Sequence, residues 1–185
     1  MKGQLLLDGG RLGGSWFHRS VVLVCEHNAE GALGLVLTKA SDSRADEVLE
    51  GDLGEKIGRL ALLVGGPVQP AALSFLRAFT VGADLPDTQS LVLPGLALGH
   101  RLEDLIELAQ GGADGKSVQV FAGYAGWSPG QLDGELKRDS WLIEPATREL
   151  VFDVPREEIW RHILRRRVKW DERLLADSPE DASWN

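Results

Sequence analysis

The sequence is poor in cysteine, in long apolar runs and in net positive charge. Cys25 is its one cysteine, so no internal disulfide can form, which fits a reducing cytoplasm. The apolar runs are strand-length, far below the roughly 20 residues that span a bilayer. The three consecutive leucines near the start are too few for a signal-peptide core of roughly 7–15 residues. We therefore predict a cytoplasmic protein with no membrane partner.

The charge and the histidine spacing exclude further classes. The formal net charge is -8, which argues against a polyanion binder that uses its whole surface. With 43% hydrophobic and 26% charged residues, the chain has a globular rather than a disordered composition. Its four histidines show no HxxxH or HExxH spacing, and no GxGxxG pattern is present. We accordingly predict neither a metal site nor a cofactor.

Short apolar runs predict the strands of a sheet. The runs are 4–7, 20–26, 32–38, 60–64, 73–79, 90–93, 118–124, 140–143 and 149–152. Turn residues His27–Gly31 join the second run to the third, which predicts a β-hairpin with a five-residue loop. Because both runs are apolar on both faces, we place this hairpin centrally in a covered sheet.

Periodic or capped segments predict the helices. They are 43–49, 101–110, a segment that begins at 128–131 and runs to about 138, and a last helix from Pro155. Strands and helices mix without strict βαβ alternation. This favours an α+β fold, with one domain over 1–170. Residues 171–185 are acidic and contain Pro179, so we expect a mobile tail there.

The segment Phe121–Leu132 is the most informative stretch for function. Small residues alternate with the aromatic residues Tyr124 and Trp127 at a strand-to-helix junction. The small residues permit close backbone approach, and each aromatic residue has a polar tip on an apolar body. The stretch predicts either a ligand pocket or tight packing of a helix on the sheet. We expect the Ser128 hydroxyl and the Gln131 side chain to cap the helix reciprocally.

The Cys25-Glu26-His27 triplet is a candidate thiol centre. On a straight strand Cys25 and His27 share a face and Glu26 points away. Residues two apart on a strand are separated by roughly 6–7 Å, whereas a thiol and its base need about 2.6–3.2 Å. The pattern is therefore more typical of a buried thiol that packs as a small hydrophobic group.

Several short motifs follow one another along the chain. They are Arg19-Ser20-Val21-Val22, Cys25-Glu26-His27-Asn28, Gly34-Leu35-Val36, Gly65-Gly66-Pro67-Val68, Gly123-Tyr124-Ala125-Gly126-Trp127, Gly130-Gln131-Leu132 and Trp141-Leu142. Their order and spacing resemble those of the YqgE/AlgH family of bacterial proteins over about residues 3–165. The resemblance implies an α+β fold with a mixed, largely antiparallel sheet flanked by helices. The family is largely uncharacterised and has no agreed catalytic residues, so none is transferred to this chain.

Three function classes follow from these observations. The first is a non-enzymatic regulatory or binding module for a small ligand or a protein partner. Its expected binding residues are Arg19, His27, Gly65, Gly66, Tyr124, Trp127 and Gln131. A hydrolase or thiol enzyme that uses Cys25, or Arg19 with Glu26, is a weaker third class, since no complete catalytic constellation is evident.

The second class is a transcriptional regulator, as some family members are described. DNA would be contacted through the basic residues Arg161, Arg165, Arg166, Arg167 and Lys169. The same run has a simpler explanation, because acids begin the helix and bases end it, which complements the helix dipole. No helix-turn-helix or zinc finger is evident.

Overall fold

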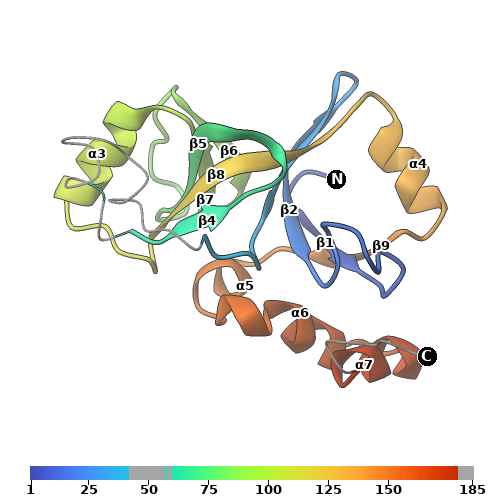
Figure 1. The fold of residues 1–185 in the computed structure, drawn as a ribbon. Coiled ribbons are helices and arrows are strands. Elements are labelled where there is room, and N and C mark those ends of the chain that lie inside the picture. Colours follow the sequence, from blue (N-terminus) through green and yellow to red (C-terminus); the bar gives the residue numbers. More distant parts are fainter. Residues whose placement is uncertain (42–56, 58–59, 179–185) are drawn as a thin grey trace.

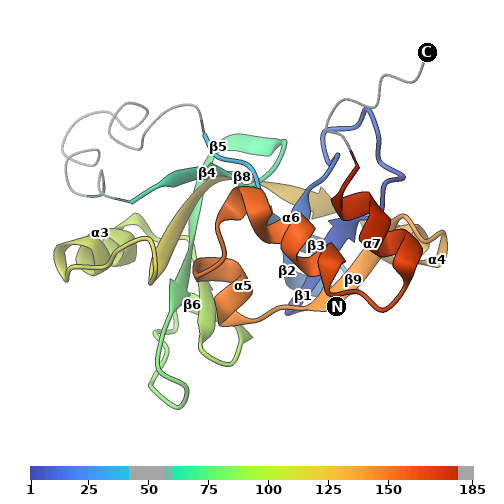
Figure 2. The same ribbon diagram turned by 90° about the horizontal axis from the view of Figure 1, so that it is seen from below.

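A curled β-sheet forms the centre of this computed structural model, which describes residues 1–41, 57 and 60–178 (Figure 1). The strands are β1 (Gln4–Asp8), β2 (Val21–Asn28), β3 (Gly31–Val36), β4 (Leu62–Val64), β5 (Val68–Ala78), β6 (Gln89–Leu93), β7 (Leu96–Gly99), β8 (Val118–Trp127) and β9 (Trp141–Pro145). The helices are α3 (Leu102–Gln110), α4 (Gln131–Lys137), α5 (Arg148–Phe152), α6 (Arg156–Arg165) and α7 (Trp170–Ala176). Helices α3 and α4 lie at opposite ends of the molecule in both views (Figures 1 and 2). The predicted α+β fold with a mixed sheet flanked by helices is confirmed.

Strand β8 is shared by the two halves of the sheet. The strand order is β6-β7-β5-β8-β3-β2-β1-β9, with β4 also paired to β8. The first part of β8 pairs with β5 in antiparallel and with β4 in parallel orientation. Its last three residues, Ala125–Trp127, pair with β3. The strand therefore changes partners near Tyr124, and this change of partners places the candidate site.

The β2–β3 hairpin lies inside the sheet, as its two apolar faces predict. Val21 and Leu23 belong to one buried cluster, whereas Val22 and Val24 belong to another on the opposite face. The predicted loop of five residues is wrong. The ladder continues to the pair Asn28↔Gly31, so only two residues lie between the strands.

A β-bulge at Cys25 changes which side chains share a face. Val24 pairs with Gly34, and the next pair along is Glu26 with Leu33, so Cys25 is the extra residue. An extra residue reverses the alternation beyond it. Glu26 therefore lies on the Leu33 face, and His27 points to the other face. The expectation that Cys25 and His27 share a face is wrong for this reason.

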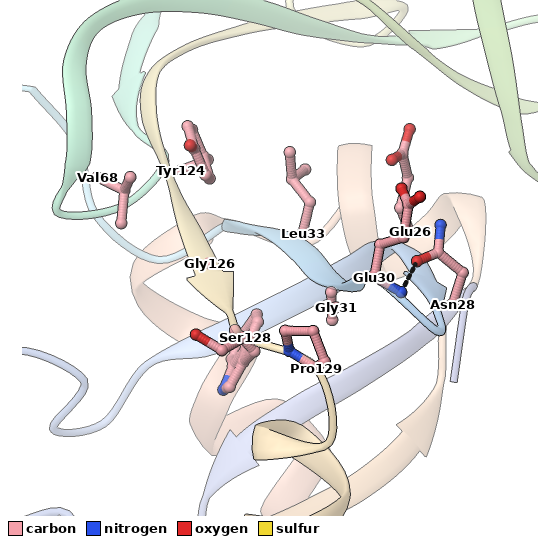
Figure 3. A pocket seen from close by; sticks show the side chains of 12 residues that line it. Glu26, Asn28, Glu30, Gly31, Leu33, Val68, Tyr124, Gly126, Ser128 and Pro129 are labelled. Atoms are coloured by element: carbon pink, nitrogen blue, oxygen red, sulfur yellow. Dashed lines mark hydrogen bonds between the residues drawn. The ribbon is translucent and has the colours of Figure 1, made fainter.

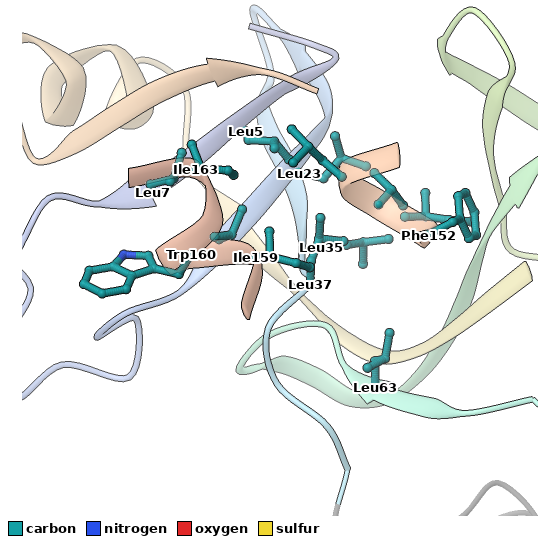
Figure 4. Close-up of a cluster of buried hydrophobic side chains, with 14 of the residues drawn as sticks. Leu5, Leu7, Leu23, Leu35, Leu37, Leu63, Phe152, Ile159, Trp160 and Ile163 are labelled. Atoms are coloured by element: carbon teal, nitrogen blue, oxygen red, sulfur yellow. The ribbon is translucent and has the colours of Figure 1, made fainter. Parts of the chain in front are cut away.

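Three buried apolar clusters join the sheet to its helices. The first lies between the sheet and α5, α6 and α7 and includes Leu23, Leu35 and Ile159 (Figure 4). The second contains Leu132 of α4, and the third contains Leu105 of α3. At about 25 cal/mol for each Å² of apolar surface buried, such clusters dominate folding stability.

The chain after β9 differs from the sequence prediction. Residues 149–152, expected as a strand, form most of α5, where the Thr147 hydroxyl accepts the Leu150 backbone N–H at 3.2 Å. A run as short as Glu149 and the three apolar residues that follow it has no periodicity that separates strand from helix. The helix from Pro155 is not the last one, because Trp170–Ala176, mostly assigned to the tail, forms α7.

The sequence prediction missed one strand, and two of the predicted segments lie partly or wholly outside the described residues. Strand β7 was not predicted; it pairs with β6 and β5. The short helix expected over 43–49 and the end of the expected tail, 179–185, lie outside the described residues. In the part of the chain that is described, no helix is long and apolar enough to cross a bilayer.

Candidate functional site

Gly65 and Gly66 press closely against β8 where it changes partners. A Cβ on Gly66 would lie 2.0 Å from the Tyr124 carbonyl carbon, and one on Gly65 would lie 2.3 Å from the Gly123 oxygen. Any larger residue would force the two backbones apart. Both glycines are buried, and neither lines the cavity beside Tyr124. The two predicted glycines therefore do not line the cavity. They lie behind it and allow the close approach of the backbone that carries Tyr124.

A cavity of about 530 Å³ opens beside Tyr124 (Figure 3). Its lining residues are Glu26, Asn28, Glu30, Gly31, Ala32, Leu33, Val68, Tyr124, Gly126, Trp127, Ser128 and Pro129. The Tyr124 ring lies near Gly126, where an added Cβ would be 3.2 Å from a ring carbon. Leu33 and Val68 add apolar surface. The volume falls in the range of roughly 300–1,000 Å³ that is typical of small-molecule sites.

The charged groups that line this cavity are acidic. Glu26 and Glu30 contribute two carboxylates, and no lysine or arginine of the described residues belongs to the lining. Within the described residues, the two carboxylates have no hydrogen bond and no ion pair, and the Tyr124 hydroxyl has no hydrogen bond. The Asn28 Oδ1 accepts the Glu30 backbone N–H at 2.8 Å, which orders the hairpin loop (Figure 3). The site is therefore negatively charged and open to a donor.

Trp127 is a lining residue of the cavity, but its side chain belongs to the second apolar cluster, with Val22 and Val24. The residue is 7% exposed. Its Nε1 donates to the Glu135 carboxylate at 2.9 Å, and the Trp141 Nε1 donates to the same oxygen at 2.8 Å. The other Glu135 oxygen accepts from Gln131 at 3.0 Å. The polar tip that indicated ligand contact is thus satisfied inside the protein.

Gln131 closes the start of α4 rather than the cavity. Its Oε1 accepts the Ser128 backbone N–H at 3.0 Å, as predicted. The Ser128 hydroxyl does not return the bond, because the Gln131 N–H is bound to the Ser128 carbonyl instead. Pro129 and the left-handed Gly130 (φ 73°) form a tight turn of the type that favours these two residues. The helix therefore begins at Gln131, the last of the four residues expected to form its start.

His27 and Cys25 are separated by the bulge. His27 Nε2 lies 3.6 Å from an Asp133 carboxylate oxygen of α4, on the face opposite the Tyr124 cavity. Cys25 is fully buried, and burial, followed by the charge of Glu26, raises the pKa of its thiol far above the ordinary range. A thiol that stays protonated is a poor nucleophile. The two groups do not form a thiol–base pair.

Arg19 lies in a different region, next to α6. Its backbone adopts the left-handed conformation (φ 51°), and its N–H donates to the buried Asp8 carboxylate at 2.8 Å. Its guanidinium stacks 5.1 Å from the Trp160 ring and donates to the Ser178 carbonyl at 2.7 Å. Arg19 and Lys39 line a separate cavity of about 220 Å³. The structure therefore does not bring Arg19 together with Tyr124.

The basic residues predicted for DNA contact are largely paired with acids. Arg165 lies 3.2 Å from Asp177, and Lys169 lies 3.5 Å from Glu172. Arg167 donates to Glu172 at 2.6 Å and to Glu144 at 3.0 Å. Arg166 lies 3.3 Å from the His162 ring, and Arg161 belongs to the wall of the Arg19 cavity. These ion pairs reduce the positive charge available to phosphates.

Sequence reasoning missed most of the cavity wall. Glu26 was assigned to the wrong face, and Asn28, Glu30, Leu33 and Val68 were not singled out. One signal for Glu26 was present, since it is the one charged residue in the two apolar runs 20–26 and 32–38. The approach of Val68 to Tyr124 depends on the β5–β8 register, which no local pattern encodes.

The fold and the cavity define a class of single-domain α+β proteins built on one curled, largely antiparallel sheet. The chain belongs to the AlgH-like family, whose profile matches residues 5–169. This confirms the resemblance drawn from the motifs. Two relatives are UPF0301 proteins of Chlorobaculum parvum, 39% identical over 96% of this chain and 92% of the relative, and of Mycobacterium marinum, 36% identical over 99% and 90%.

Two solved structures are also similar. The solution structure of the AlgH protein from Pseudomonas aeruginosa matches with a TM-score of 0.71 and 28% identity, over 98% of this chain and 95% of that one. A crystal structure of a Corynebacterium diphtheriae protein matches with a TM-score of 0.78 and 24% identity, over 94% and 90%. Both support the fold described above, and neither name states a ligand or a reaction.

Proposed function

We propose that this protein is a non-enzymatic binding module that takes a cationic group, an amine or a guanidinium, into the Tyr124 cavity. The observation that carries the proposal is the pair of carboxylates, Glu26 and Glu30, in an open cavity of about 530 Å³ that no cationic residue in the described part of the chain lines. The cation belongs to a small ligand or to a segment of a partner protein.

The chemistry of the wall supports this choice of ligand. A carboxylate without an internal partner gains most from a charged donor. The face of a tyrosine ring attracts a cation within about 6 Å of its centroid. Leu33 and Val68 provide apolar surface for the methylene stem that carries an ammonium or guanidinium group. A ligand with one cation on an aliphatic stem therefore satisfies both the polar and the apolar parts of the cavity.

The absence of a catalytic role is part of the same proposal. Cys25 is buried with a raised thiol pKa, and His27 lies on the opposite face beside Asp133. The described residues also contain no group of three or more histidine, cysteine or acidic side chains placed to hold a metal ion. The cavity offers recognition groups rather than a nucleophile with its base.

Titration calorimetry with defined cations tests the proposal. The probes are spermidine, arginine methyl ester and a short lysine-rich peptide, each titrated into the full-length protein at low and at physiological salt. We expect saturable binding of at least one probe, weakened by salt and by Glu26→Gln. Glu158→Gln, an exposed acid on α6, is the matched control and leaves binding unchanged. Absence of binding by all three probes, or binding that Glu26→Gln leaves intact, would reject the proposal.

Contact with DNA is the alternative that the sequence raised. Its support is weaker, because acids pair with Arg165, Arg167 and Lys169. Binding of duplex DNA that declines steeply with salt and is lost in Arg165→Ala would favour it over the cation-binding cavity.

A further inference from the structure

A second cavity of about 730 Å³ lies between α3 and the sheet, at the end of the molecule opposite α4 (Figure 1). Strands β5, β6 and β8 form one wall, and one side of α3 forms the other. None of its lining residues belongs to the Tyr124 cavity. It is therefore a separate site, independent of the function proposed above.

The strand register places two polar side chains on the sheet wall. Gly99 of β7 pairs with Gln89 on one side and with Phe75 on the other. Paired residues of neighbouring strands share a face, and so do residues two apart on one strand. Gln89, Phe75 and Arg77 therefore share the face that packs against α3. Because Phe75 is buried in the cluster with Leu105 of α3, Gln89 and Arg77 are polar residues on an otherwise apolar surface.

Both polar groups lack a partner within the described residues. Gln89 is 9% exposed, and its buried Oε1 has no hydrogen bond. The half-buried Arg77 guanidinium has no hydrogen bond or ion pair. A buried acceptor without a partner costs about 1–3 kcal/mol, so native proteins seldom retain one without a reason. A ligand that binds both groups needs an N–H donor for the Gln89 oxygen and an anionic group for the Arg77 guanidinium.

The helix wall contributes the opposite charge. Asp104, Glu107, Leu108 and Gly111 all line the cavity, and their spacing puts them on one side of α3. One Asp104 oxygen accepts the Thr88 hydroxyl, and the other lies 4.0 Å from Arg101. The exposed Glu107 carboxylate has no such partner in the described residues. Arg101, which precedes α3, also lines the cavity, but it lies 3.6 Å from Glu103 and 4.0 Å from Asp104. The cavity thus has a cationic sheet wall, and the free charge of its helix wall is the Glu107 carboxylate.

We infer that this cavity binds a free α-amino acid. The Arg77 guanidinium takes the ligand's carboxylate, since a guanidinium fork matches a carboxylate in geometry. The Gln89 Oε1 and the Glu107 carboxylate accept from the ammonium group. The remaining volume and the apolar Leu108 and Val118 accommodate the ligand's side chain. A simple carboxylate or a simple amine satisfies only one of the two walls.

Amide NMR of the full-length, nitrogen-15-labelled protein tests this inference. Each common L-α-amino acid is titrated at millimolar concentration. Acetate and methylammonium, which carry only the carboxylate or only the ammonium group, serve as half-ligands for comparison. We expect at least one amino acid to give saturable shifts at Gln89, Gly111 and Gly112, and the half-ligands to give none. If no amino acid shifts these signals, or if acetate or methylammonium shifts them equally, the inference is wrong.

Two variants separate binding from folding. Arg77→Met should weaken amino-acid affinity by about tenfold or more, the usual effect of losing a charge-assisted bond. Arg173→Met, an exposed arginine of α7, is the control and should leave affinity unchanged. Gln89→Leu should also weaken binding, yet raise the melting temperature by about 2–4 °C, because it removes an unsatisfied buried acceptor. Unchanged affinity in both Arg77→Met and Gln89→Leu would overturn the inference.

Discussion

The two sides of β8 near its carboxyl end make opposite use of an aromatic residue. On one side the Trp127 indole is buried, and its N–H is bound to Glu135 at 2.9 Å. On the other side Tyr124 lines an open cavity, and its hydroxyl has no partner in the described residues. We call these the closed side and the open side. The polar groups of the closed side stabilise the fold, whereas those of the open side remain available to bind a ligand.

This difference explains why the aromatic residues alone do not locate a binding site. Both have a polar tip on an apolar body, and both occur in one five-residue stretch. The indole N–H finds its acceptor because α4 packs across Trp127 and Trp141, and Glu135 lies on that helix. Tyr124 packs against the first apolar cluster, but none of the described helices supplies an acceptor or donor to its hydroxyl. The function of each tip is decided by what the fold places opposite it.

Gly66→Ala tests whether the open side is held in place by the close approach of two backbones. The new Cβ would lie 2.0 Å from the Tyr124 carbonyl carbon, and backbone atoms cannot rotate away as a side chain can. Overpacking costs about 1–3 kcal/mol and occasionally more, and we expect a loss of at least about 3 kcal/mol in the free energy of unfolding. Urea unfolding followed by tryptophan fluorescence measures it.

Gly115→Ala is the matched control for this change. An added Cβ there meets nothing within 4 Å, so the effect should stay within about 0.5 kcal/mol. Equal losses in the two alanine variants would show that glycine flexibility, rather than the approach to Tyr124, explains the result.

Glu135→Ala tests the closed side. It leaves the indole N–H groups of Trp127 and Trp141, two buried residues, without their shared acceptor. Hydrogen bonds to charged groups contribute about 1.5–3 kcal/mol each, and we expect a combined loss of about 2–4 kcal/mol. Glu135→Gln keeps an acceptor oxygen and should lose less than half as much. Equal losses in both variants, measured by urea unfolding, would contradict the role given to these hydrogen bonds.

Cys25 lies next to Glu26 in sequence and at the border between the buried core and the open side. Burial raises the pKa of its thiol in the folded state, so the folded protein keeps the proton that the unfolded chain releases above about pH 8.5. The corresponding stability is present below that pH and is lost as pH rises. We expect the free energy of unfolding to fall by about 1.4 kcal/mol for each pH unit above it.

The comparison that isolates this effect is with Cys25→Ala. Other groups titrate in the same pH range, so the measured quantity is the difference between the two proteins in urea unfolding at pH 8, 9 and 10. If the two stabilities change in parallel, Cys25 is not protected from solvent as the structure indicates.

The parts of the fold that sequence predicted well are those decided by local pattern. The β2–β3 hairpin is central because two consecutive apolar runs leave no polar face. The hydrogen bond that the Ser128 backbone N–H donates to the Gln131 side chain also lies within four residues. In contrast, residues 149–152 became a helix through the Thr147 cap, since a short apolar run fits either structure.

The candidate site was harder to predict because it depends on one inserted residue and on distant pairing. The bulge at Cys25 turns Glu26 toward Leu33 and turns His27 toward Asp133. No feature of the amino-acid sequence around Cys25 identifies it as the extra residue of a bulge. Val68 reaches Tyr124 only through the β5–β8 pairing. The aromatic residue of the cavity was therefore found from sequence, whereas its carboxylates were not.

Tyr124→Phe and Glu26→Gln make the smallest changes and sharpen the contrast most directly. Neither removes a hydrogen bond or an ion pair within the described residues, so each should alter the free energy of unfolding by less than about 0.5 kcal/mol. The Glu135→Ala variant, measured beside them by urea unfolding, gives the scale of a group that the fold depends on. A loss above about 1 kcal/mol for either variant would mean that its polar group already has a structural partner. The open side would then resemble the closed side, and the cavity would lose the feature that distinguishes it.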